Sequence, residues 1–266
     1  MVKMFLTCKL LKLDPSSETR SKLLEILLKS RKGYTYDKWE ALDESFDLNF
    51  YIYFVTEYDY GRIIQLYYEK LISLHQISKK ITEEDEESFG FTQINQKVAL
   101  GPFFLSLFEK EPLENFVGIL AGNKVSTEIS TILSKEVSKR LDKQVYPLKP
   151  IKILIEKKQK EIRNIPDFYD VVEILVENIP DPYVDWAWIK GTMLDQSEEY
   201  YKFVESPQRG VLKVLAIRFR NRTYYLYDDG RIFTKEADLS SDVKRQVELR
   251  YIFEITRRLN NVGALI

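Results

Sequence analysis

Arginine and tyrosine recur at short intervals in residues 216–234, AIRFRNRTYYLYDDGRIFT. Guanidinium groups can pair with phosphates through two hydrogen bonds, and tyrosine rings can stack on bases. Nine of the 14 arginines lie in residues 206–266, where 12 basic residues outnumber seven acidic ones. The pattern predicts a local surface that binds an anionic partner, with single-stranded nucleic acid favoured over a duplex. The candidate nucleic-acid-binding residues are Arg218, Arg220, Arg222, Tyr225, Tyr227 and Arg231.

The elements that must position these residues are three antiparallel strands. Asp229-Gly230 is a two-residue hairpin signal, and Asn221-Arg222 marks the turn before it. This register places Phe219 opposite Tyr224 and Leu226 opposite Phe233. The expected apolar side, made of Ile217, Phe219, Leu226 and Phe233, packs on a final helix that begins near Ser240 or Ser241 and uses Val243, Val247, Ile252, Ile255 and Leu259. The expected open side carries Ala216, Arg218, Arg220, Tyr225, Tyr227, Ile232 and Thr234.

A structural interpretation of the same face competes with the binding one. Cross-strand arginine and tyrosine neighbours are common on the solvent-exposed face of an antiparallel sheet. Ile232 on the open side favours a contact with the N-terminal half of the chain. The sequence lacks the Gly-Phe-Gly-Phe type of RNA-binding signature, a zinc finger and a GxxG loop. The prediction of nucleic-acid binding therefore rests on composition and pattern.

Other residues that could do chemistry give weaker signals. Glu57 and Asp59 end a predicted strand and could share a divalent cation if a third ligand came from elsewhere, which is the basis of an alternative as a metal-dependent nuclease or transferase. His75 is the only histidine, and its place in a predicted helix favours packing over catalysis. The tryptophans of residues 185–190, DWAWIK, could clamp a peptide, but burial in a core is favoured. No catalytic residue, metal site or cofactor is predicted.

The composition limits the class of protein that the chain can be. Hydrophobic residues make up 44% and charged residues 30% of the 266 residues, which is typical of a globular protein, and the formal charge of -1 gives no overall attraction to phosphate. Cys8 has no cysteine partner in the chain, and no segment reaches 18 consecutive apolar residues, so a cytoplasmic protein without a membrane span is expected. The abundance of Lys and Glu, with little Cys, Met and His, would suit a hot environment.

The chain is expected to form two α+β domains. Residues 1–147 read as three units of a strand followed by a helix, with strands over 4–13, 49–59 and 114–122, helices over 18–30, 61–81 and from Asn123 onwards, and a solvated acidic loop over 82–88. The prolines of residues 146–150, YPLKP, mark the boundary, and residues 151–266 follow with helices over 151–164 and 167–179 and a strand over 183–189. The leading functional prediction is a non-enzymatic binding protein, with an enzyme or a protein-interaction adaptor as the alternatives, and no oligomeric state is predicted.

Overall fold

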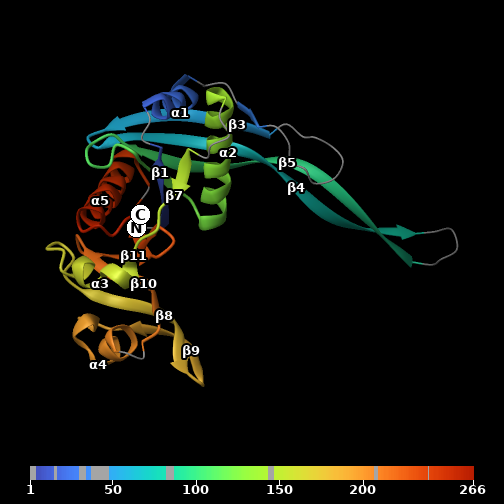
Figure 1. Cartoon of the computed structure of the whole chain (residues 1–266). Coiled ribbons are helices and arrows are strands. Elements are labelled where there is room, and N and C mark those ends of the chain that lie inside the picture. Colours follow the sequence, from blue (N-terminus) through green and yellow to red (C-terminus); the bar gives the residue numbers. More distant parts are fainter. Residues whose placement is uncertain are drawn as a thin grey trace.

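The structure is a computed structural model that describes residues 4–14, 17–29, 34–36, 48–81, 87–142, 147–206, 209–238 and 240–266. In this part of the chain the strands form one sheet of 12 strands, in the order β2-β3-β4-β5-β6-β1-β12-β11-β10-β8-β9, and β7 pairs with β1. The pairings between these strands are antiparallel, and helices lie on both faces (Figure 1). The expected α+β class is therefore confirmed.

The elements have these bounds. The strands are β1 Met4–Leu13, β2 Tyr34–Tyr36, β3 Leu48–Tyr58, β4 Gly61–Ile81, β5 Glu87–Phe108, β6 Phe116–Leu120, β7 Leu148–Pro150, β8 Val171–Asp181, β9 Val184–Lys190, β10 Val211–Phe219, β11 Arg222–Tyr227 and β12 Arg231–Ala237. The helices are α1 Ser17–Lys29, α2 Asn123–Leu141, α3 Ile155–Arg163, α4 Glu198–Tyr200 and α5 Asp242–Asn261, with short helical turns at Leu194–Gln196 and Tyr201–Glu205.

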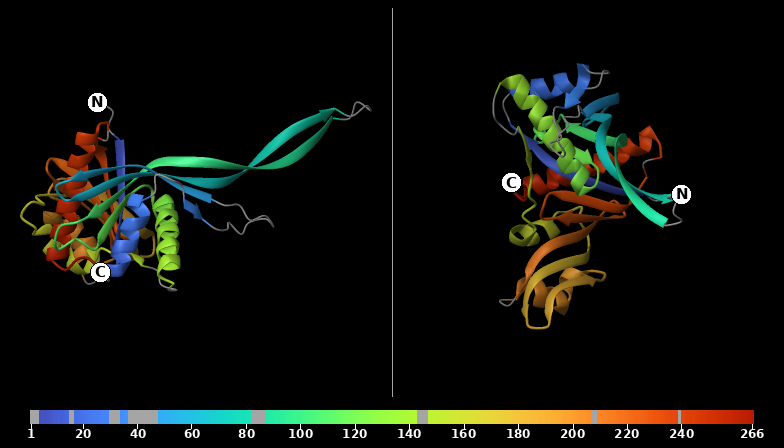
Figure 2. Two further views of the ribbon diagram at one scale, coloured as in Figure 1. Left: turned by 90° about the horizontal axis from the view of Figure 1, so that it is seen from above. Right: turned by 90° about the vertical axis from the view of Figure 1, so that its right-hand side faces the viewer.

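Two large cores lie on opposite faces of the sheet. On one face, α1 and α2 pack on β1, β4, β5 and β6, where Leu11 and Leu13 of β1 are buried. On the other face, α3 and α5 pack on β8, β10, β11 and β12, where Leu6 and Cys8 of β1 are buried. Residues of alternate parity on β1 thus serve both cores, as expected for a central strand. Figure 2 shows α1 and α2 together on one side of the sheet.

A long two-stranded ribbon projects from the body (Figures 1 and 2). It consists of β4 and β5, which stay paired from Gly61 and Phe108 to Ile81 and Glu87. The pairing of β3 with β4 ends at Tyr68, and β6 pairs with β5 only from Phe104 onwards. In the described residues, the outer part of the ribbon is therefore paired only with itself.

Two of the predicted helices are strands. Residues 61–81, predicted as a helix, form β4, and residues 171–181 form β8 where a helix over 167–179 was expected. In β4, Ile63 belongs to the core under α5 and Ile64 to the core under α1 and α2, so neighbouring residues are buried on opposite faces. A strand covered on both faces carries consecutive apolar residues, and periodicity alone cannot distinguish it from a buried helix.

Other predicted elements are confirmed. The strand and helix at β1 and α1, the strand before α2, the charged helix α3, the strand β9 and the final helix α5 form where expected. Gly122, and not Asn123, is the N-cap of α2, whereas the side chain of Ser241 caps α5 by accepting a hydrogen bond from Lys244 N. Most of the predicted acidic loop, residues 82–86, lies outside the described residues.

The sheet continues across the predicted domain boundary. β7, from the boundary segment, pairs with β1, and β1 also pairs with β12, so both halves of the chain share one set of hydrogen-bonded strands. The division into residues 1–147 and 151–266 stays a prediction.

The turns of the C-terminal meander differ from the predicted ones. The β10–β11 turn is Arg220-Asn221, whose φ angles of 52° and 61° suit a type I′ hairpin, and it sets Phe219 opposite Arg222. The β11–β12 loop has three residues, 228–230, because Leu226 pairs with Ile232 and not with Phe233. This shift by one residue exchanges the two faces of β12, so Ile232 is buried in the core and Phe233 lies on the opposite face.

Gly230 explains the three-residue loop. Its φ of 84° is the left-handed conformation that closes such a loop. A Cβ atom at this position would lie 2.0 Å from the carbonyl oxygen of Ile151, which crosses beneath the loop. The loop is also held by hydrogen bonds from Leu10 N to the Gly230 oxygen and from Ile153 N to the Asp228 oxygen. Glycine is therefore required here by both the backbone and the packing.

Candidate binding face and edge strand

The predicted binding residues do not form one surface. Tyr225 and Tyr227 lie on the side of the meander that carries the small apolar cluster of Val172, Val214 and Ala216, and Arg218 shares that side because it alternates with Ala216. Arg231 joins them, with its guanidinium 4.2 Å from the ring centroid of Tyr227. Arg220 occupies the turn, and Arg222 lies on the opposite side against α5. The expected single patch of four arginines is therefore wrong, as is the placement of Ile232 and Thr234 on its face.

Each of the four arginines has a carboxylate partner. Arg218 lies 3.7 Å from Asp170, Arg220 lies 3.6 Å from Glu254, and Arg231 lies 2.8 Å from Asp229. Arg222 donates to Glu248, a buried residue of α5 that also accepts a hydrogen bond from the backbone N–H of Asp238. A phosphate at these positions would have to compete with a carboxylate of the protein.

The tyrosine rings are also covered. The side chain of Tyr225 is almost fully buried, with Lys235 5.2 Å from its ring centroid, and the ring of Tyr227 carries Arg231. These rings are stacked on cations of the protein. They are not free platforms for bases.

Glu173 of β8 is the centre of a hydrogen-bond network on this side of the sheet. It accepts hydrogen bonds from the hydroxyl of Tyr225 (3.0 Å) and the indole N–H of Trp188 (3.0 Å), and it pairs with the ammonium of Lys190 (2.9 Å). Burial by itself raises the pKa of this carboxyl, but the hydrogen bonds from Lys190, Trp188 and Tyr225 outweigh it and hold the pKa of Glu173 below its ordinary range. Burial and the hydrogen bond to Glu173 raise the pKa of Tyr225. The network fixes the edge strand β9 to the sheet.

The tryptophans of β9 lie on the surface. Trp186 is 60% exposed and Trp188 45% exposed, and Tyr183 before them is 93% exposed. The expectation that these tryptophans anchor a core is wrong, because β9 is the last strand of the sheet and Trp186 and Trp188 stand on a face that no described helix covers. The alternation of VDWAWIK predicted the strand, but it could not show that the strand lies at an edge.

This end of the molecule is acidic as well as aromatic. Residues 177–205 contain seven acidic and two basic residues, and the basic Lys190 is already paired with Glu173. Further exposed apolar side chains, Tyr169, Met193 and Tyr201, lie in the neighbouring segments. The indole rings of Trp186 and Trp188, exposed on one face of β9, are of the kind found at protein interaction sites.

The predicted strand-end acids do not gather into a metal site. Glu57 is exposed and lies 3.3 Å from Arg62 across the β3–β4 hairpin, and Asp59 is an exposed residue of its turn. Among the residues that the structure describes, no three His, Cys, Asp or Glu side chains approach closely enough to hold a metal ion. His75 lies in the ribbon, where its backbone pairs with Gln93, and not in a helix. Cys8 is buried, which raises the pKa of its thiol to about 12 and makes it unreactive.

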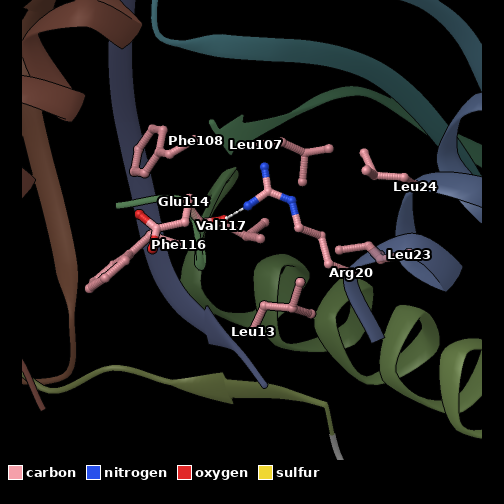
Figure 3. A pocket seen from close by; sticks show the side chains of 9 residues that line it. All are labelled: Leu13, Arg20, Leu23, Leu24, Leu107, Phe108, Glu114, Phe116 and Val117. Atoms are coloured by element: carbon pink, nitrogen blue, oxygen red, sulfur yellow. Dashed lines mark hydrogen bonds between the residues drawn. The ribbon is translucent and has the colours of Figure 1, made fainter. Parts of the chain in front are cut away.

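Two cavities formed by described residues are candidate ligand sites. The first, between α1 and the β5–β6 hairpin, is lined by apolar side chains around the guanidinium of Arg20, which donates to the carbonyl oxygen of Glu114 (Figure 3). Its volume of about 10 Å³ holds at most one water molecule. The second, about 200 Å³, opens beside Lys152, Lys157 and Lys213, but Lys213 is paired with Asp228 at 2.8 Å. Neither cavity brings together the groups of a recognisable catalytic site.

Comparison with known proteins gives no match: no family model, curated protein or solved structure is similar to the chain. None of the helices within the described ranges combines the length and the apolar character needed to span a membrane. The candidate site is therefore defined by the geometry of β8, β9 and the meander alone.

Proposed function

We propose that this protein is a binding protein that holds a protein partner at its β9 end. The exposed aromatic residues of an edge strand, Trp186 and Trp188, are the observation that carries the proposal. Tryptophan is enriched among the residues that dominate protein–protein binding energy, because it offers a large rigid surface and an N–H donor. The indole N–H of Trp188 already donates to Glu173, so this hydrogen bond holds the ring in place before a partner binds.

Site-specific photocrosslinking tests this proposal. A photoreactive phenylalanine derivative at position 186, introduced into the full chain in its native host, is expected to form a discrete protein adduct that survives nuclease treatment. Val243, which is 70% exposed near the start of α5, provides the matched control position. Equal crosslinking from positions 186 and 243, or adducts that nuclease removes, would contradict a protein partner at β9.

Nucleic acid is the second candidate partner. The observation that favours it is the group of cations on the meander side that faces away from α5, where Arg218 is about half exposed and Arg231 and Lys235 lie over tyrosine rings. The carboxylate partners of Arg218 and Arg231 reduce the free energy that these arginines gain by binding phosphate. Weak and strongly salt-dependent binding is therefore expected. Of the residues predicted from the sequence, this candidate retains Arg218 and Arg231 as phosphate contacts, whereas the rings of Tyr225 and Tyr227 are covered by Lys235 and Arg231. Arg222 is paired with Glu248 of α5, and Arg220 lies in the turn.

A titration with fluorescein-labelled single-stranded DNA at several salt concentrations tests the second candidate. Arg218→Ala is expected to weaken binding and to lower the salt dependence by about one counterion. Arg220→Ala, the matched control in the turn, is expected to leave binding unchanged. Undetectable binding at low salt, or equal effects of the two substitutions, would reject nucleic acid as a partner.

A further inference from the structure

Along its outer edge, the backbone of β9 has hydrogen-bonding groups that no described strand pairs with. Gly191 N donates to the Val172 oxygen over 2.9 Å, and the register continues with Ile189 opposite Ile174. In an antiparallel pair, hydrogen-bonded and non-hydrogen-bonded positions alternate. The N–H and C=O groups of Ile189 therefore point to β8, and those of Trp186 and Trp188 point to the open edge.

In the part of the chain that the structure describes, no strand pairs with this edge. Natural proteins usually protect such an edge with lysine, proline or a bulge, because a free edge pairs readily with another strand. Of the residues Val184–Ile189, only Asp185 is charged, and Lys190 at the end is paired with Glu173. The register of β8 with β9 shifts between Glu177 and Asp181, so the regular stretch from Trp186 to Ile189 is the part of the edge available for strand addition.

The charges around the edge select the kind of strand. Asp185 is exposed, and Glu177 lies opposite Trp186 in the register with β8. Strand positions alternate between the two faces, so Asp185 stands on one face of β9 and Trp186 with Glu177 on the other. An added strand would lie beside the carboxylate of Asp185 on one face and beside two indole rings, which attract cations, on the other, with Glu177 one strand further in.

We infer that the partner segment is an extended, arginine- or lysine-rich strand that adds to the edge of β9, a deduction that rests on the proposed protein-binding function. The backbone of the added strand pairs with Trp186 and Trp188. Its basic side chains lie over the indole rings on one face and beside Asp185 on the other. This is the strand-addition mode of peptide recognition, in which main-chain hydrogen bonds supply affinity and side chains supply specificity.

Calorimetric titration of the full-length protein with defined peptides tests the inference. The probe is a ten-residue peptide in which pairs of arginines alternate with pairs of threonines, so that arginines lie on both faces of the added strand. Two matched peptides serve as controls: one has glutamate in place of arginine, and the other has N-methyl groups on the alternate residues that would donate to β9. The unmodified arginine peptide is expected to bind at least about tenfold more tightly than either control, since a tenfold change corresponds to about 1.4 kcal/mol.

Charge reversal on the protein provides the second arm. Asp185→Lys is expected to lower the affinity for the arginine peptide several-fold and to raise the affinity for the glutamate peptide. Glu198→Lys, which alters an exposed acid of α4, is expected to change neither affinity. Equal binding of the N-methylated and unmodified peptides would overturn strand addition, and an unchanged preference in Asp185→Lys would overturn the cationic partner. If no peptide binds while position 186 still crosslinks to a protein, this inference fails and the proposed function stands.

Discussion

The indole N–H of Trp188 lies 3.0 Å from the carboxylate of Glu173 and links the edge strand β9 to its neighbour β8. The same carboxylate accepts the hydroxyl proton of Tyr225 from β11. One buried charge thus joins the consecutive strands β8 and β9 to β11, which lies further along the sequence. Loss of the Glu173 charge should therefore destabilise the whole C-terminal part of the sheet.

Glu173→Gln is expected to destabilise the protein at pH 7 by about 1 to 3 kcal/mol, because the charge-assisted hydrogen bonds from Lys190, Trp188 and Tyr225 become weaker. The folded-state pKa of Glu173 is lowered, so this stabilisation is fully present above its ordinary pKa of about 4.3 and is lost as the pH falls through the folded value. Urea unfolding of both proteins at pH 7 and about pH 3 measures the change. A difference between them that does not shrink in acid would show that the charge of Glu173 contributes nothing.

Gly230→Ala is expected to cost about 2 to 4 kcal/mol of folding free energy, because its Cβ would collide with the carbonyl oxygen of Ile151 at a positive φ. Gly263 is the matched control, since it has a similar φ of 66° but nothing within 4 Å of an added Cβ. Gly263→Ala should therefore cost only the backbone strain, about 1 kcal/mol. Thermal unfolding of both variants checks the difference, and equal losses would contradict the close approach of Ile151.

Arg222→Ala should destabilise the protein by about 2 to 3 kcal/mol, because it leaves the buried Glu248 without its ion-pair partner. Arg220→Ala, in the adjoining turn, should change the free energy of unfolding by less than about 1 kcal/mol, because its partner distance is long and its side chain is half exposed. Denaturant titration measures both. Similar effects of the two substitutions would show that the division between a structural and a surface arginine is wrong.

Removal of the outer ribbon should leave the body folded. A variant in which Asn-Gly joins Lys70 to Val98, a pair opposite each other in the ribbon, keeps every pairing of β4 with β3 and of β5 with β6. Its melting temperature is expected to fall by no more than about 4 °C. A shorter variant that joins Ile64 to Leu105 deletes the buried Leu66 and should fail to fold. Failure of the first variant would show that the outer ribbon stabilises the body.

The sequence predicted elements best where one face of a strand or helix is polar. The alternation of VDWAWIK and the Ser241 cap identified β9 and α5 because local pattern and final environment agree. In β8, Val171, Val172 and Ile174 are buried on both faces, so their apolar run gave a helix-like signal. Branched residues such as these favour strands, and that signal could have corrected the assignment.

The candidate site depended on a register that composition cannot fix. Asp229-Gly230 correctly indicated a turn, but Asp228 belongs to the loop as well, and one extra residue moved Ile232 and Phe233 to opposite faces. The partners of the arginines could not be predicted either, because Glu248 approaches Arg222 only after α5 packs on the meander. Local rules indicate where strands and turns form, whereas the contacts between distant segments decide which charges remain available.

The place of β1 in the sheet bears on how the chain folds during synthesis. Lys9 of β1 donates to the backbone of Asp229, 220 residues later, and β1 pairs directly with β12. A nascent chain that has formed β1, β6 and α2 still lacks the strand that covers the other edge of β1. That edge therefore stays without β12, and open to incorrect pairing, until the ribosome has released the last strand of the meander.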